Sequence, residues 1–281
     1  MNMDRNKYII RNSENIANDG EDFIGIQVLK AVVSALCIGE AYQLYSKAEV
    51  GMSESLLGMG LVSVGIGLLF GIYRGCRWCR LLSWMSWISL PLVVVYFLTI
   101  AFLHWTSDPA NPFKQGSLLN HAVRYCAPLV LAFWIGFIAQ KKLVHLPELW
   151  CWVLRIAVSA TFLGHGLNAM RGSPGHVELI QLTCLNLFSW EVNELLARQC
   201  LRCIGVMDML LAVTLLLRKW KWIAMWMALW GLVTATSRLT AYGVDKGWSL
   251  TAIRLGNGGV PFVVWWIWKY GKTGENSLLG K

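Results

Sequence analysis

The sequence predicts an all-α polytopic membrane protein, with about eight transmembrane helices arranged as two parallel-oriented four-helix bundles. Three observations lead to this prediction. Of the 281 residues, 56% are hydrophobic, only 15% are charged and 16 are Trp, which is outside the usual composition of soluble domains. Apolar stretches long enough to cross about 30 Å of hydrocarbon as helices recur along the chain. The two halves of the chain also resemble each other.

The chain begins with a polar segment and then alternates between apolar stretches and short polar connections. Residues 1–22 are mixed in charge and lack the apolar segment of a cleavable signal peptide, so residues 1–25 are interpreted as a cytoplasmic N-terminal tail. In the long connection 171–199 we expect a surface helix around Leu185 to Leu196. The expected spans lie near 26–45, 55–73, 81–104, 119–140, 149–170, 200–217, 220–243 and 250–270.

The connections differ in their positive charge. The second, fourth and sixth connections and the C-terminus hold eleven Lys and Arg residues, whereas the odd-numbered connections hold five. The positive-inside rule therefore places both termini in the cytoplasm. Because the positive residues form short clusters instead of one basic face, the net charge of +9 does not indicate nucleic-acid binding. We expect an integral protein of a prokaryotic inner membrane, in contact with the lipid bilayer.

An internal duplication divides the chain into a first half, 26–142, and a second half, 143–281. Because each half holds four spans, both halves enter the membrane in the same orientation, with the pseudo-symmetry axis along the membrane normal. The matching segments are LKAVVSALCIGEAYQLY (29–45) with LRIAVSATFLGHGLNAM (154–170), RWCRLLSWM (77–85) with KWKWIAMWM (219–227), and HAVRYCAPLV (121–130) with TAIRLGNGGVPFVV (251–264).

Polar side chains within the expected spans of the second half form one candidate site. Such residues are costly in a bilayer and usually face the bundle interior, a partner or a water-filled cavity. The predicted orientation places all of them in the outer half of the bilayer, where the acid and the two Arg residues could neutralise each other. They are His165, Asn168, Asp208, Arg238, Arg254 and Asn257.

The aligned positions of the first half keep only part of this polar character, so the first half is interpreted as a degenerate copy. Two interpretations of the second-half cluster stay open. It could be a set of buried pairs that fix helix packing, or a pocket for an anion, a quinone headgroup or another substrate. Proton transfer is a further alternative. The first-half counterparts are Glu40, Gln43, Ser63, Tyr96 and Arg124.

Aromatic and cysteine patterns add candidates of lower specificity. Trp222, Trp226 and Trp230 recur every four residues, which favours lipid contact or helix packing over a quinone platform. Two CxxC pairs are possible redox thiols, and the predicted topology separates them across the membrane, which excludes a shared zinc site. The five His residues show no metal or haem spacing, and no metal site is predicted. The thiol pairs are Cys76 with Cys79 and Cys200 with Cys203.

The second half resembles the DoxX family of four-helix membrane proteins. The resemblance is carried by LRIAVSATFLGHGLNAM (154–170) with its His165–Gly166 pair, by RCIGVMDMLLAVTLLLRKWKW (202–222) with Gly205 and Asp208, and by the basic turn that follows. In the family, a Lys or Arg usually follows the His–Gly pair closely, whereas here Asn168 and Ala169 come before Arg171. The acid of the second helix is usually Glu in the family and is Asp208 here. The resemblance implies a four-helix fold and a membrane subunit of a redox system, such as a thiosulfate:quinone oxidoreductase.

Three functions are consistent with the sequence. The first is a membrane subunit of a larger redox or respiratory assembly, with other membrane subunits as partners and a quinone or oxyanion in an outer-leaflet pocket. The second is a non-catalytic scaffold or assembly subunit that binds partner transmembrane helices. The third is a small-solute carrier, which is less favoured because paired interruptions of the spans are not evident in both halves. The sequence names no catalytic residue.

Overall fold

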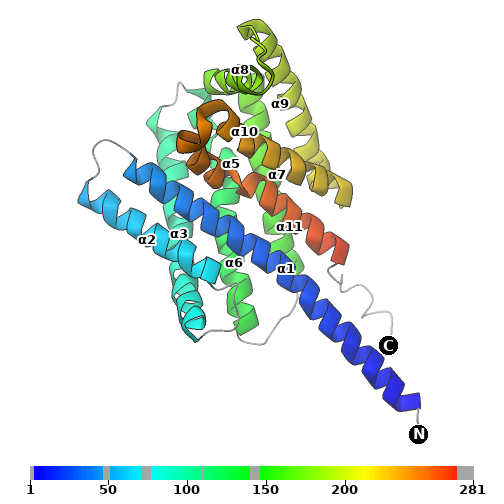
Figure 1. Ribbon diagram of the computed structural model, residues 1–281. Helices are drawn as coiled ribbons and strands as arrows, with labels where there is room; N and C mark the ends of the chain where they lie inside the picture. Colours follow the sequence, from blue (N-terminus) through cyan, green and yellow to red (C-terminus); the bar gives the residue numbers. More distant parts are fainter. Residues whose placement is uncertain (1–2, 47–50, 71–76, 109–110, 140–145, 271–281) are drawn as a thin grey trace.

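The computed structural model describes residues 3–46, 51–70, 77–108, 111–139 and 146–270, and within these ranges every regular element is a helix. The long helices run alternately toward and away from the end of the molecule on which α8 lies (Figure 1). The helices are α1 (Met3–Tyr45), α2 (Met52–Phe70), α3 (Arg77–Ser107), α4 (Pro112–Gln115), α5 (Ser117–Asn120), α6 (Ala122–Ala139), α7 (Glu148–Met170), α8 (Pro174–Phe188), α9 (Glu194–Leu217), α10 (Lys221–Arg254) and α11 (Gly256–Tyr270).

Four helices in the described part of the chain are long and apolar enough to cross a membrane. They confirm an all-helical chain with membrane-spanning character, while the arrangement of eight spans in two bundles stays a prediction. The other long helices are interrupted by polar residues or are shorter; α7 carries Arg155 and His165, and α11 has 15 residues. The four spans are Ile24–Tyr45, Met52–Leu69, Ile88–Ser107 and Glu194–Leu217.

Two helix starts differ from the sequence prediction. Helix α1 begins at Met3, so the expected tail continues directly into the first span, whose apolar part begins at Ile24. Helix α9 begins at Glu194 instead of near residue 200, because the Asn193 side chain accepts a hydrogen bond of 2.8 Å from the backbone N–H of Leu196. This N-cap satisfies one of the amides that a helix start leaves unpaired.

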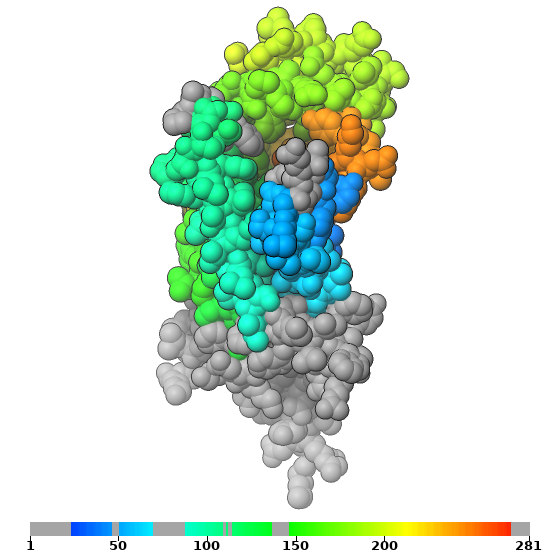
Figure 2. Space-filling model, turned by 90° about the vertical axis from the view of Figure 1, so that its left-hand side faces the viewer, coloured from blue at the N-terminus to red at the C-terminus, as the bar shows by residue number. Residues whose placement is uncertain are grey.

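The prediction of a surface helix around Leu185 to Leu196 is wrong. The surface helix is α8, which begins earlier, with Pro174 in its first turn, where proline's fixed φ favours helix initiation. It ends at Phe188, because Ser189 adopts a left-handed conformation with φ 51°. Figure 2 shows that α8 and the beginning of α9 form one end of the molecule, which we call the α8 end.

Helix α10 contains a break at Gly243, close to the predicted end of the seventh span. Gly243 has φ 74° and ψ 172°, a conformation that residues with a Cβ atom rarely adopt. The chain then continues as a second helical segment, up to Arg254, before α11 begins at Gly256. The break allows the chain to turn across the α8 end before it re-enters the helix bundle.

The hydrophobic core is shared by the two halves of the chain. Helix α1 packs against α2 and α6 of its own half and also against α10 and α11 of the second half, while α7 packs against α9 and against α6 of the first half. One continuous cluster of buried residues therefore includes Leu29 and Val33 of α1 together with Leu154 and Val158 of α7. The two halves form a single packed unit.

Candidate functional site

A cavity of about 220 Å³ lies among α7, α8, α9, α10 and α11, near the α8 end. Most of its wall is apolar and comes from side chains such as Phe162, Leu179, Ile180, Leu201 and Ile204. Four of the six residues of the predicted cluster also line it, and each comes from a different helix. These four are His165, Asp208, Arg238 and Asn257.

Close contact between α7 and α9 places Asp208 beside the cavity. A Cβ atom on Gly166 would lie 2.8 Å from the carbonyl oxygen of Gly205, and one on Gly205 would lie 2.7 Å from the carbonyl oxygen of Gly166. Only glycine allows the two backbones to approach this closely. Asp208 follows Gly205 by about one turn, so its carboxylate enters the space between the helices, on the side where His165 emerges from α7.

The carboxylate of Asp208 is bound by an indole group and forms no ion pair with any residue that the structure describes. The Trp230 Nε1–H donates a hydrogen bond of 2.9 Å to Asp208 Oδ1. Among the described residues, no Arg nitrogen lies within 4 Å of this carboxylate, although the side chain is only 7% exposed. The expected neutralisation of Asp208 by direct Arg pairing is therefore wrong. Trp230, interpreted from the sequence as a lipid or packing residue, is its hydrogen-bond partner.

The two Arg residues instead donate to carbonyl groups of their own helices. The Arg238 guanidinium donates to the Thr234 carbonyl oxygen and lies 3.5 Å from the hydroxyl of Ser237. The Arg254 guanidinium donates to the Leu250 carbonyl oxygen at 3.1 Å. Each Arg bonds a carbonyl four residues earlier, where helix geometry brings the side chain back along its own backbone. Arg238 lines the cavity, whereas Arg254 lies outside its wall.

A second imidazole, which the sequence analysis did not place in the cluster, faces His165 in the cavity. The rings of His165 on α7 and His176 on α8 are 6.2 Å apart between centroids and nearly perpendicular. Burial, together with the charges of Arg238 and Arg254, lowers the pKa of His176 from 6.5 to about 4, so His176 is neutral at pH 7. The sequence prediction placed the surface helix around Leu185 to Leu196, so His176 fell outside it and was not assigned to the cluster.

Asn168 belongs to a different environment from the rest of the predicted cluster. It is 1% exposed and does not line the cavity. Its amide nitrogen would lie 3.6 Å from a Cβ atom on Gly116, so the side chain is directed toward the first half of the chain. Neither side-chain polar atom of Asn168 has a hydrogen-bond partner among the described residues.

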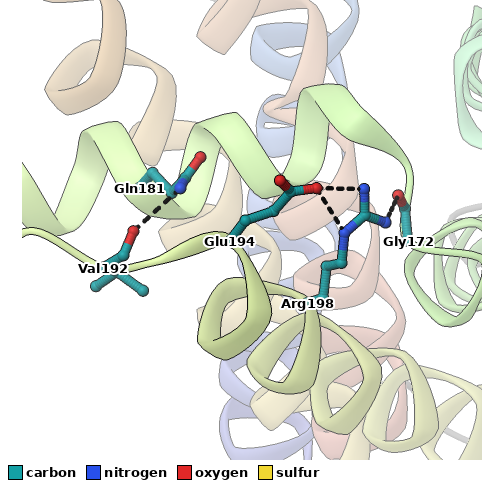
Figure 3. A network of polar contacts seen from close by, with 5 residues as sticks. All are labelled: Gly172, Gln181, Val192, Glu194 and Arg198. Atoms are coloured by element: carbon teal, nitrogen blue, oxygen red, sulfur yellow. Dashed lines mark hydrogen bonds and ion pairs between the residues drawn. The ribbon is translucent and has the colours of Figure 1, made fainter.

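Helix α8 is held beside the cavity by polar contacts before its start, at its middle and near its end. In Figure 3, the Gln181 amide donates to the Val192 carbonyl at 3.0 Å, and Arg198 joins the Glu194 carboxylate, at 2.6 Å, to the Gly172 carbonyl, at 3.1 Å. On the opposite side, the Asn186 amide donates to the Thr240 carbonyl of α10 at 2.8 Å. These bonds fix α8 to both α9 and α10.

The first-half counterparts do not all lie together in the described part of the chain. The Tyr96 hydroxyl donates to a Glu40 carboxylate oxygen at 3.2 Å, and Arg124 interacts electrostatically with both. Gln43 instead donates to the Ser249 hydroxyl of the second half at 2.6 Å. The Ser63 hydroxyl is exposed and donates to the carbonyl of Met59 at 2.9 Å, so it faces away from the other four.

The predicted thiol pairs are described only in part. Cys200 and Cys203 are exposed free thiols on one turn of α9, and Cys184 is a free thiol in the cavity wall. Cys76 lies outside the described residues, as does the side chain of Cys79. In the described ranges, no group of three or more His, Cys, Asp or Glu side chains could hold a metal ion.

Arg155 is a buried charge that the sequence analysis overlooked. Its Nε and Nη2 atoms donate to the carbonyls of Leu215 and Leu216, at 2.5 and 2.7 Å. Its guanidinium also lies 4.0 Å from the ring centre of Trp152 and 5.3 Å from that of Trp268. Arg155 therefore caps the C-terminus of α9 and joins it to α7 and α11.

Comparisons with protein-family models, with curated proteins and with solved structures found no match.

Proposed function

We propose that the chain is an integral membrane protein that binds a small apolar ligand with a polar headgroup in the cavity among α7, α8, α9, α10 and α11. The observation that carries this proposal is the convergence of four polar side chains from four helices on a mainly apolar cavity. Such a combination is typical of small-molecule sites, in which apolar walls supply affinity and a few polar groups fix orientation.

A quinone headgroup is the ligand class that the cavity chemistry supports best. The carbonyl oxygens of a quinone need hydrogen-bond donors, and a ring N–H of His165 or His176 and the amide of Asn257 provide them. An anion is less suitable, because the carboxylate of Asp208 lies in the same wall as the single guanidinium of Arg238. At about 220 Å³, the cavity is below the roughly 300–1,000 Å³ that drug-sized ligands occupy, so it fits a single ring and leaves a tail outside.

The position of the cavity also favours a ligand that arrives from the bilayer. Val233 lines the cavity and is nevertheless 56% exposed, so the cavity reaches the outer surface of α10. Leu229, one turn away on the same helix, is 54% exposed, which is expected of a face in contact with lipid. A lipid-soluble ligand would enter the cavity at Val233 without crossing water.

The proposal includes a tandem duplication of a DoxX-like four-helix unit, acting as a membrane subunit of a redox assembly. Support for the duplication comes from two aligned glycines. A Cβ atom on Gly39 would lie 2.9 Å from Ala252 Cβ, and one on Gly164 would lie 2.9 Å from Leu119 Cβ. Each glycine thus touches the segment of the opposite half that precedes its last long helix, α11 or α6, as a two-fold relation between repeats requires.

Equilibrium binding of a short-chain benzoquinone to the detergent-purified protein tests the ligand class. Ile204→Trp, which fills the cavity, should abolish saturable binding. Val206→Trp is the matched control, because Val206 lies two residues further along α9, is 42% exposed and does not line the cavity. Equal binding by the two variants, or no saturable binding by the native chain, would overturn the proposal.

Purification in mild detergent tests the role as a subunit. A redox assembly predicts that the chain co-purifies with other subunits and with bound quinone. The double change Asp208→Asn with Arg254→Gln separates this role from that of a scaffold. For a scaffold it would alter the yield of the complex without changing turnover, whereas for a quinone-binding subunit it would lower turnover at equal yield.

A further inference from the structure

The link between α9 and α10 carries an exposed group of basic and aromatic side chains, which we call the basic link. All five residues from 218 to 222 are exposed, with Trp220 at 57% and Trp222 at 83%. In the described part of the chain, the side chains of Arg218, Lys219 and Lys221 form no ion pair and donate no hydrogen bond within the protein. Three cationic groups are therefore available to an external partner.

The basic link follows directly on a surface that is suited to lipid. Val213 is 48% exposed and Leu217 is 75% exposed on the last turns of α9, which is one of the four helices capable of crossing a membrane. An apolar helix face that ends in Trp and Lys residues is the usual pattern at the boundary between hydrocarbon and headgroups. The basic link thus lies at the level of the lipid headgroups.

The end of α11 also carries a basic residue beside aromatic residues, as the basic link does. The Lys269 ammonium lies 4.8 Å from the ring centre of Trp265 and 4.7 Å from that of Tyr270, and α11 packs along α10. Stacking on two aromatic rings holds this ammonium close to the protein surface. It adds a fourth cation near the basic link.

The distribution of charge in the described second half favours an anionic partner at this end. Among residues 146–270, the only acidic residue at the basic-link end is Glu148, in the first turn of α7. Toward the α8 end, and apart from Asp208, Arg238 and Arg254 in and around the cavity, four acidic residues are matched by four basic residues. The cations at the basic-link end are Arg155, Arg218, Lys219, Lys221 and Lys269; the charged residues toward the α8 end are Glu178, Glu191, Glu194 and Asp245 with Arg171, Arg198, Arg202 and Lys246.

We propose that the basic link is a binding site for the phosphate of anionic phospholipids in the leaflet that it faces. Lys219 and Lys221 supply the charge, with Arg218 as a third donor, and Trp220 and Trp222 anchor the link among the headgroups. The site is independent of the cavity, and it would hold the end of α9 and the start of α10 at a fixed depth in an anionic leaflet.

The test compares two tail-labelled lipids, phosphatidylglycerol and phosphatidylcholine, for binding to the detergent-purified full chain. The native protein should prefer phosphatidylglycerol, and this preference should weaken as salt is raised. Each cation near a headgroup contributes roughly fivefold in affinity, so Lys219→Gln with Lys221→Gln should weaken phosphatidylglycerol binding roughly 25-fold and leave phosphatidylcholine binding unchanged.

The matched control is Arg202→Gln with Lys246→Gln, which removes two exposed cations from the other end of the same half. It should keep the native preference for phosphatidylglycerol. Lys219→Arg with Lys221→Arg keeps the charge and should bind as the native chain does, which separates loss of charge from loss of fold. Equal binding of the two lipids by the native chain, or an equal loss in both double Gln variants, would overturn the proposal.

Discussion

Replacing Arg155 by Met should lower the stability of the protein more than any exchange of an exposed cation. The change keeps an unbranched side chain of similar length, which stays compatible with the helical position in α7. It removes both hydrogen bonds to the end of α9 and the contacts with Trp152 and Trp268. The carbonyls of Leu215 and Leu216 then lose their common donor.

The expected cost follows from these contacts. Hydrogen bonds from a charged donor contribute about 1.5–3 kcal/mol each, and a cation–π contact about 0.5–2 kcal/mol. Met relieves the cost of burying the charge of Arg155, which is only 7% exposed, so the sum is reduced. We expect a net loss of about 2–4 kcal/mol, which corresponds to a fall in Tm of roughly 5–10 °C.

Thermal unfolding of the purified protein measures this effect. After the exposed thiols of Cys200 and Cys203 have been blocked in the folded state, a thiol-reactive dye that reports exposure of buried thiols such as Cys37 follows the loss of the core. Arg155→Lys should fall between the native chain and Arg155→Met, because an ammonium cannot make the same fork of two bonds. Arg202→Met, at an exposed position of α9, should change Tm by no more than about 1–2 °C. A Tm for Arg155→Met equal to that of Arg202→Met would refute the reasoning.

Three further predictions concern the cavity and the contact between the halves. Trp230→Phe removes the donor to the cavity carboxylate; it should weaken benzoquinone binding about tenfold in equilibrium dialysis and, because the buried acceptor loses its partner, lower the stability by about 1–3 kcal/mol. Gly164→Ala places a Cβ atom 2.9 Å from the backbone nitrogen of Asn120 and should cost about 1–3 kcal/mol in thermal unfolding, whereas Gly175→Ala, with no atom within 4 Å, should not destabilise. Because the pKa of His176 is about 4 in the folded chain and near 6.5 in the unfolded chain, the unfolded state binds more protons between these values; stability should therefore fall by roughly 1–2 kcal/mol from pH 7 to pH 5, and His176→Gln should reduce this fall.

The sequence was sufficient to predict helices and to bring together four of the residues that line the cavity. Helical periodicity and the alternation of apolar and polar segments are local properties, so His165, Asp208, Arg238 and Asn257 could be assigned to one depth from their places in the spans. The side-chain partners could not be assigned. Whether Asp208 meets an Arg or the indole of Trp230 depends on helix rotation, which packing determines.

Arg155 and His176 differ in whether the sequence contained a pattern that could have predicted their roles. The repeat alignment pairs Lys30 with Arg155, and both are buried, at 8% and 7% exposure, so two aligned cations inside apolar helices could have indicated a structural role. No comparable signal existed for His176. Its place in the cavity depends on a helix that begins at Pro174 and ends before Ser189. Composition and periodicity do not predict the backbone conformation of a single serine.

The packing of α1 against α10 and α11 has a consequence for synthesis and membrane insertion. Gln43 and its partner Ser249 are separated by 206 residues, so α1 leaves the ribosome long before the helices that complete its surroundings. At about 5–20 residues per second, the interval is roughly 10–40 s. During that time Glu40 and Gln43 are in the bilayer without their second-half neighbours, Arg254 and Ser249. The first half therefore depends on lipid, the insertion machinery or another membrane protein to shelter one flank of α1 until translation has nearly finished.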